Sequence, residues 1–311
     1  MVAAREDHRT VLLHQAVDAL NVRADGTYMD GTFGRGGHSR LILDRLGERG
    51  RLVGFDKDQE AVRAARQQFG GDPRFSMVHG SFTRIAAVAQ ELGLQRGVDG
   101  VLLDLGVSSP QLDEAGRGFS FMQDGPLDMR MDRTSGVSAA EWLANAEEEE
   151  MTTVFRDYGE ERFARRIARA IVHDRAESPL LRTRQLAALI ERASPFREKH
   201  KHPATRTFQA IRIHINRELE DLQLCLRDSL EVLAAGGRLV VISFHSLEDR
   251  IVKRFCRRMA GRPEHAGDTR TQDERQERAK MISTRPIVPS QAEIDRNPRS
   301  RSARLRALRR L

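Results

Sequence analysis

Short apolar runs alternate with amphipathic stretches through the first part of the chain. Apolar runs of this length, separated by segments with helical periodicity, predict buried parallel strands joined by helices. The alternation therefore predicts an α/β domain of the doubly wound, Rossmann-like kind. The four expected strands are 27–29, 51–56, 74–79 and 98–104.

The alternation stops after Leu112. From there to about Ile215 the chain shows helical patterns and loops without a clear strand, which predicts an all-helical insertion. A long helix is expected over Thr207–Leu233, ended by the glycine pair at 236–237, and a fifth strand over Arg238–Ser243.

The closing part of the sheet is less clearly marked. Two short extended pieces, near Ile287 and at 303–308, are candidates for a final hairpin, and the charged segment 262–280 is expected to be mobile. The predicted organisation is a discontinuous Rossmann-like domain, 1–112 and 216–311, interrupted by a helical substrate-recognition domain, 113–215.

A glycine-rich loop follows the first expected strand. Four glycines lie between Gly31 and Gly37, directly after Asp30. The loop lacks the G-x-x-x-x-G-K-[ST] pattern of a phosphate loop, and Ser39 stands where a dinucleotide fingerprint has its third glycine. An acid followed by x-x-x-Gly-x-Gly is typical of Rossmann-like methyltransferases that use S-adenosylmethionine (AdoMet), whose ammonium an acid can hold. The alternative is a turn that only connects strand and helix.

Three further candidate residues stand where expected strands end. Asp56 comes at the distance from the glycine loop at which an acid receives ribose hydroxyls, although it could instead cap the next helix. Phe82 is either a stacking face for adenine or a core residue, and Asp104 ends the fourth strand. Because the carboxyl ends of parallel strands meet at one edge of a sheet, these residues are expected to gather with the loop.

Composition narrows the class of protein. The net charge of +7 and the pI of about 10.0 favour a polyanionic partner. The two cysteines, Cys225 and Cys256, form no CxxC pair, which predicts a reducing compartment and no structural zinc, and no ligand cluster suggests another metal. The chain has no apolar run long enough to span a bilayer, and its polar N-terminus shows no secretory signal, so a cytoplasmic protein is expected.

Six longer phrases identify a family. Together they resemble the bacterial 16S ribosomal RNA cytosine-N4-methyltransferase family, also called RsmH or MraW, in the right order over nearly the whole chain. The phrases are 30–39, 103–111, 117–121, 125–131, 203–210 and 243–250.

The resemblance implies AdoMet-dependent methylation of the N4 amine of cytosine 1402 in 16S rRNA, with free rRNA or the small ribosomal subunit as the partner. It also implies which residues contact AdoMet, and each matches the family in kind: Gly36, Gly37, His38, Asp56, Phe82, Asp104 and Gln111. A homodimer formed through the helical insertion is a further expectation.

The catalytic base is not identified by the sequence. Asp104 is either an acceptor for the N4 amine or a cofactor ligand, and the family favours the ligand. The aromatic residue that stacks on the target base in many amino-methyltransferases is absent after the fourth strand, where Phe119 or Phe121 is either its substitute or a hydrophobic anchor.

RNA is expected to contact basic residues of the insertion, although each one alone is as well explained as a solubilising surface residue. They are Arg165, Arg166, Arg169, Arg206, Arg212 and the linker 199–202. The rival functions are an NAD-dependent oxidoreductase, which the glycine spacing disfavours, and an assembly factor with an inactive Rossmann fold, which the intact loop and acids disfavour.

Overall fold

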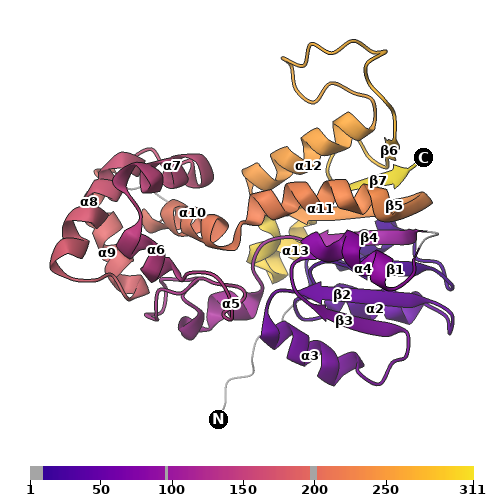
Figure 1. Ribbon diagram of the computed structural model, residues 1–311, viewed down its shortest axis with the longest axis horizontal. Helices are drawn as coiled ribbons and strands as arrows, with labels where there is room; N and C mark the ends of the chain where they lie inside the picture. The colour runs from indigo at the N-terminus through magenta and orange to yellow at the C-terminus, as the bar shows by residue number, and fades with distance from the viewer. Residues whose placement is uncertain (1–9, 95–96, 197–201) are drawn as a thin grey trace. The chain divides into compact units, whose positions relative to one another are not determined.

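A computed structural model describes residues 10–94, 97–196 and 202–311. The chain forms two compact units. The first takes the described residues up to Gly106 together with Leu219–Leu311, and the second is Val107–Glu218, which contains the predicted insertion (Figure 1).

The first unit is built on one seven-stranded sheet with the order β3-β2-β1-β4-β5-β7-β6. The first five strands in this order are parallel, and β7 runs antiparallel to both β5 and β6. This confirms the predicted α/β class and all five predicted parallel strands. The strands are β1 Thr27–Asp30, β2 Arg51–Asp56, β3 Phe75–His79, β4 Val98–Asp104, β5 Leu233–Ser243, β6 Ala279–Met281 and β7 Arg304–Arg310.

Helices cover both faces of this sheet, and the alternation of side chains along each strand supplies both cores. Tyr28 and Leu52 pack into one hydrophobic cluster, with α1, α2 and α3, whereas their neighbours Met29 and Val53 pack into the other, with α4, α11 and α12. The helices are α1 Leu13–Leu20, α2 Gly37–Arg45, α3 Gln59–Phe69, α4 Ile85–Glu91, α11 Glu218–Val232, α12 Ser246–Met259 and the short α13 Gln291–Arg296.

Three sequence predictions are wrong in detail. The long helix is interrupted, because Arg217 adopts φ 52° and ends α10 (Ala204–Asn216) before α11 begins. Gly236 lies within β5 and caps no helix. The outer partner of β7 is β6, whose first two residues belong to the segment 262–280 expected to be mobile, and Ile287 makes only an isolated bridge to Leu305. The left-handed backbone conformation of Arg217 has no signal in the sequence, and a strand of three residues is too short to show a periodic pattern.

The second unit has a core of its own in which large apolar residues from several helices meet, among them Trp142, Phe155, Ile167 and Ile211. Its described residues form an isolated bridge between Pro126 and Arg182 and otherwise no strand. The helices are α5 Ser109–Asp113, α6 Ala139–Asn145, α7 Glu148–Gly159, α8 Ala164–Glu177, α9 Thr183–Ala193 and α10. No helix in the described part of the chain is long and apolar enough to cross a membrane.

Candidate cofactor site

The side chain of Asp30 forms hydrogen bonds with residues at both ends of the glycine loop. Its Oδ1 accepts a hydrogen bond from the backbone N–H of Thr32 (3.1 Å), and its Oδ2 accepts one from Oγ of Ser39 at the start of α2 (2.7 Å). The side chain is buried, and desolvation raises its pKa to about 6 despite both bonds. The geometry therefore gives Asp30 an organising role in the loop and does not support the ammonium-binding role suggested by its position.

The glycines of the loop serve two different purposes. Gly36 has φ 78°, and a Cβ there would lie 2.6 Å from the Phe33 ring; at Gly37 it would lie 1.8 Å from Oγ1 of Thr10. Gly34 also has positive φ, but the nearest atom to its Cβ would be the Thr32 carbonyl oxygen, 3.9 Å away. Gly36 and Gly37 thus allow close packing of the chain on itself, whereas Gly34 borders open space that a ligand can fill.

Asp56 at the end of β2 ties two loops together. Its Oδ2 accepts a hydrogen bond from the backbone N–H of Gly34 (2.8 Å), and its Oδ1 accepts one from the N–H of Asp58 (2.8 Å). The cap of α3 is Asp58, whose side chain accepts from the N–H of Glu60, so the helix-cap alternative for Asp56 is wrong. Burial raises the pKa of Asp56 to about 6, with Asp58 and Asp30 adding to the rise.

Asp104 and His38 lie next to each other beside the loop. The backbone N–H of Asp104 donates to Oγ1 of Thr32 (2.6 Å), and its Oδ2 lies 3.6 Å from Nδ1 of His38. Burial lowers the pKa of His38 to about 4, so its imidazole is neutral near pH 7 and the contact is not an ion pair.

Two buried polar atoms of this pair lack a partner among the described residues: Oδ1 of Asp104 and Nε2 of His38. The pKa of Asp104 is raised well above its usual value by burial and by the charges of Asp30 and Glu248. Buried polar groups are normally satisfied, so this corner is suited to a ligand that donates a hydrogen bond and carries positive charge.

Phe82 begins a short 3₁₀ helix, Phe82–Arg84, after β3, and it packs partly against the core that contains α4 and α11. Its ring is 6.0 Å from Nζ of Lys57, which forms a 2.6 Å ion pair with Asp221 of α11. Asp221 also accepts from Oγ of Ser81 (3.0 Å). The sequence did not single out Lys57 or Asp221, because Asp221 reaches this position only through the return of the chain from the second unit.

Gln111 belongs to the second unit. Its side-chain Oε1 accepts a hydrogen bond from the backbone N–H of Ser108 (3.0 Å) at the start of α5, and the residue is buried. This bond holds Gln111 as a capping residue of α5. Its predicted contact with the cofactor stays a prediction.

Phe119 and Phe121, the two candidates for a base-stacking residue, differ in their burial. Phe119 is buried in the helical core, which makes it a hydrophobic anchor. Phe121 is half-buried, packs edge-on against Phe208 (centroids 4.8 Å apart) and lies at a tilt against the His202 ring (4.6 Å).

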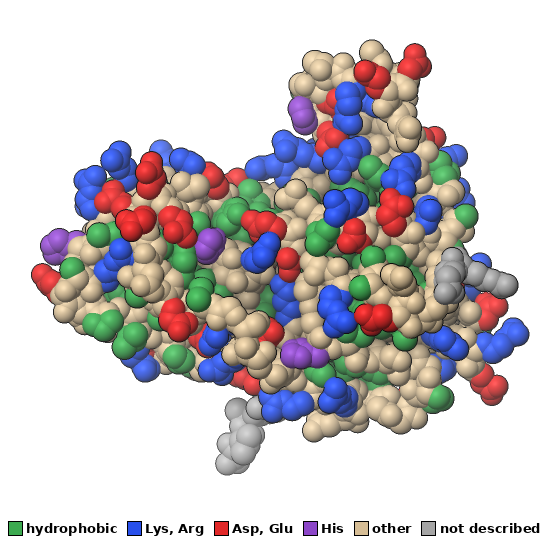
Figure 2. Space-filling model, in the orientation of Figure 1, with side chains coloured by type: hydrophobic (Ala, Val, Ile, Leu, Met, Phe, Trp, Pro, Cys, Tyr) green, Lys and Arg blue, Asp and Glu red, His purple; other side chains and the backbone are tan. Residues whose placement is uncertain are grey.

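The basic residues expected to contact RNA differ in exposure. Arg165 and Arg169 are exposed on α8, each 3.7 Å from Oε1 of Glu148. Arg212 instead makes two 2.8 Å hydrogen bonds to Glu218 and is 16% exposed, which supports a structural role. In the linker, 199–201 lie outside the described residues. On the visible face of the molecule basic side chains are interspersed with acidic ones, including over α7 and α8 (Figure 2).

Comparison with known proteins settles the family. The model of the MraW methylase family matches residues 5–311. This chain belongs to that family. A protein named ribosomal RNA small subunit methyltransferase H from Thioalkalivibrio sulfidiphilus is 59% identical over 305 residues, which cover 98% of this chain and 97% of the relative. Its namesake from Shewanella amazonensis is 56% identical over 306 residues, with the same coverage.

Solved structures of methylases also align along the whole MraW chain. An rRNA-methylase structure from Clostridium thermocellum aligns with a TM-score of 0.47 at 12% identity, covering 97% of this chain and 99% of that one. A methyltransferase from Streptococcus mutans, solved in complex with SAH, aligns with a TM-score of 0.44 at 11% identity and the same coverage.

As an MraW methylase the protein uses AdoMet, and its own site fits that cofactor. Three carboxylates, the buried Asp30 and the half-buried Asp56 and Asp104, end neighbouring strands β2-β1-β4, and desolvation raises the pKa of each. A cationic ligand relieves this cost, whereas the diphosphate of NAD would increase it. Open space beside Gly34 and the unpaired Oδ1 of Asp104 supply room and a hydrogen-bond acceptor.

Proposed function

We propose that this protein methylates the exocyclic N4 amine of cytosine 1402 in the 16S rRNA of the small ribosomal subunit, in the cytoplasm. The observation that carries the proposal is the 59% identity, over 98% of the chain, to a protein named ribosomal RNA small subunit methyltransferase H. The choice of cytosine N4 rests on the six sequence phrases, which run from the glycine loop to 243–250.

The charge of the first unit supports the methyl donor in this proposal. AdoMet supplies an electrophilic methyl group on a sulfonium. The N4 amine would take this methyl group as the S–C bond breaks and S-adenosylhomocysteine leaves, and the proton released from the amine would pass to water. Because such a displacement needs an in-line approach, positioning is the main task of the protein. Asp56 would hold the ribose hydroxyls, and its bond to the Gly34 N–H fixes it relative to the loop.

Asp104 has the free acceptor capacity that either of its two proposed roles requires. Its buried Oδ1 can accept from the cofactor ammonium or from the N4–H of cytosine, and the family resemblance favours the first. His38 keeps a neutral ring beside this carboxyl group, so no imidazolium charge competes with a cationic ligand for Asp104.

The experiment incubates the protein with methyl-labelled AdoMet and either purified small subunits or naked 16S rRNA, then maps the labelled nucleotide. The expected result is one label on cytosine N4 at position 1402. Label at another nucleotide would overturn the proposed position. No label on either substrate, with AdoMet still bound, would instead favour an assembly factor with an inactive fold.

A further inference from the structure

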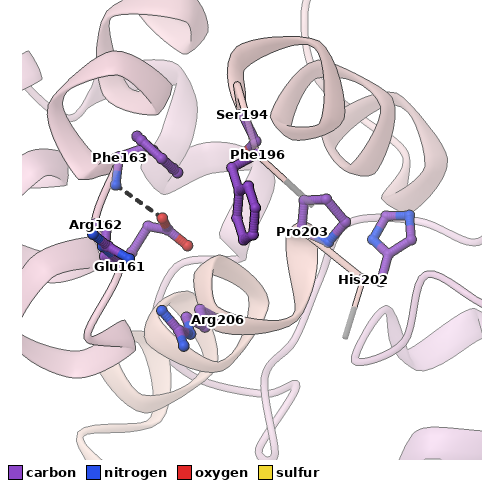
Figure 3. Close-up of a pocket in the computed structure, with 8 residues that line it drawn as sticks. All are labelled: Glu161, Arg162, Phe163, Ser194, Phe196, His202, Pro203 and Arg206. Atoms are coloured by element: carbon purple, nitrogen blue, oxygen red, sulfur yellow. Dashed lines mark hydrogen bonds between the residues drawn. The ribbon is translucent and has the colours of Figure 1, made fainter. Parts of the chain in front are cut away.

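A pocket that opens to solvent lies entirely within the second unit. It is formed where α7 passes into α8, where α9 ends and where α10 begins (Figure 3). No residue of the glycine loop or of the strand ends lines it. Its lining residues are Glu161, Arg162, Phe163, Ser194, Phe196, His202, Pro203 and Arg206.

Phe196 is the most unusual residue of this pocket, because a phenylalanine side chain there is 64% exposed. In Figure 3 its ring stands at the centre of the group, with Phe163 and Glu161 on one side and Pro203 on the other. An exposed aromatic ring among basic side chains is how proteins stack unpaired nucleobases, since every base offers a π-face. The ring is therefore placed as a stacking surface for a base.

Glu161 gives the pocket a fixed acceptor. It is 8% exposed, and its Oε1 accepts a hydrogen bond from the backbone N–H of Phe163 (2.9 Å). The preceding residue, Glu160, takes φ 48° where α7 ends, and the N–H of Glu161 donates to the Phe155 carbonyl oxygen (3.1 Å). This turn and the bond to Phe163 hold the carboxylate on the side of Phe196 in Figure 3.

A carboxylate in this position selects among bases. Each carboxylate oxygen can accept more than one hydrogen bond, so Glu161 retains acceptor capacity after its bond to Phe163. Guanine presents two adjacent N–H donors, N1–H and the N2 amine, to a single carboxylate. Uracil has no amine, and cytosine and adenine each present an amine next to a ring nitrogen acceptor. The site is therefore suited to guanine.

The remaining charge of the pocket suits a phosphate. Arg162 is exposed, and the Arg206 guanidinium, which donates to the Glu160 carbonyl oxygen (3.3 Å), lies on the same side as Glu161 in Figure 3. Two arginines against one carboxylate leave the lining with a net positive charge. This complementarity favours a nucleic-acid strand over an acidic or apolar protein surface as the occupant.

We infer that this pocket binds one unpaired guanine nucleotide of the RNA substrate, at a position other than the methylated cytosine. Phe196 stacks on the base, Glu161 accepts from its N1–H and N2 amine, and Arg162 and Arg206 neutralise the phosphate. The inference rests on the proposed function only in taking the RNA to be the substrate. By binding this guanine, the pocket would determine which stretch of RNA the enzyme accepts.

The first experiment measures binding of the full-length protein to the pentanucleotides UUGUU, UUAUU, UUCUU and UUUUU at low salt. The wild type is expected to prefer UUGUU at least fivefold. Phe196→Ala should weaken binding of all four about tenfold, because the stacking of one base is lost. Phe196→Tyr should restore it. Glu161→Gln, which keeps an oxygen acceptor for the Phe163 N–H, should remove the guanine preference and leave binding of UUUUU within twofold.

Controls come from the same unit. Leu181 is 56% exposed and Glu149 lies on the surface of α7, so Leu181→Ala and Glu149→Gln test the loss of an exposed apolar or acidic side chain. Both should bind all four pentanucleotides as the wild type does. Methylation assays on the rRNA should show a KM for RNA raised about tenfold in Phe196→Ala, with kcat and AdoMet affinity within twofold of the wild type.

Equal binding of the four pentanucleotides by the wild type, or unchanged RNA affinity in Phe196→Ala, would overturn the inference. If Phe196→Ala instead dissociated a dimer in sedimentation and left RNA affinity unchanged, the ring would serve a second copy of this chain. Failure of the proposed function looks different: the rRNA would carry no label, while the pentanucleotide preference would still be measured.

Discussion

The two units of this protein place their charged side chains in opposite ways. In the first, buried or half-buried carboxylates end the strands around the glycine loop, and desolvation raises the pKa of Asp30 and Asp56 to about 6. In the second, arginines such as Arg162 and Arg165 stand at the surface, and Phe196 is exposed among them. The difference matches two ligands of opposite charge, a cationic cofactor and a polyanionic substrate.

The net charge of +7 hides this division. The acids at the strand ends are few, and Asp30 and Asp56 are held by hydrogen bonds from backbone N–H groups or a hydroxyl. Several arginines of the second unit stand at its surface. Changes at one buried acid should therefore have large, specific effects on the cofactor, whereas RNA binding should respond to conditions that act on many charges together.

The largest effect is expected from Asp56→Ala. The substitution removes the proposed acceptor for the ribose hydroxyls and the bond that holds the Gly34 N–H, so AdoMet affinity should fall by 1.5–3 kcal/mol, about 10- to 150-fold. Isothermal titration calorimetry measures this. The matched control is Asp25→Ala, at an exposed turn position before β1, which should change affinity less than twofold. An Asp56→Ala protein that is folded and binds AdoMet within twofold of the wild type would exclude the ribose role.

The second-largest effect is expected from salt, which should weaken RNA binding much more than AdoMet binding. If about three phosphates are neutralised, raising the salt concentration from 50 to 200 mM should weaken RNA binding about 20-fold. AdoMet affinity should change less than threefold over the same range, because the acids around the cofactor are buried and poorly screened. Fluorescence anisotropy with labelled RNA gives the slope. A flat RNA titration would show that the arginines of the second unit do not contact phosphates.

The smallest of these effects is the pH dependence of AdoMet binding. Asp56 has its pKa raised from 3.8 to about 6, so between these values the folded, unliganded protein holds a proton that the unfolded chain has lost. This contribution to stability is complete below pH 3.8 and is lost as the pH rises through about 6. A cationic ligand prefers the ionised carboxylate, so lowering the pH from 7 to 5 should weaken AdoMet binding about tenfold.

Calorimetry at pH 5, 6 and 7 tests this, with circular dichroism to verify that the protein stays folded. Asp56→Asn, which cannot ionise, should bind more weakly and with a flatter pH profile. An AdoMet affinity that is constant from pH 7 to 5 in the wild type would mean that Asp56 does not titrate in this range, and the burial argument would then be wrong.

The sequence by itself determined the parts of this molecule that depend on local pattern. Apolar runs such as 51–55 form strands because a parallel strand covered on both faces needs apolar side chains on both. The glycine loop is visible because positive φ and close packing require glycine at Gly36. The acids Asp56 and Asp104 could be assigned to one edge of the sheet, since parallel strands place their carboxyl ends together.

The tertiary structure alone decided what those residues contact. Asp58, and not Asp56, caps α3. Both carboxylate oxygens of Asp30 accept hydrogen bonds from within the loop, from Thr32 and Ser39. Which of two neighbouring acids caps a helix or accepts a loop N–H depends on ångström differences in their positions, and the spacing of residues in the sequence does not determine such differences. The Lys57–Asp221 ion pair joins residues far apart in the chain, and the pocket around Phe196 and Glu161 forms where α7 passes into α8, α9 ends and α10 begins. Sequence periodicity does not predict contacts of this kind, because they arise from the packing of whole helices and strands.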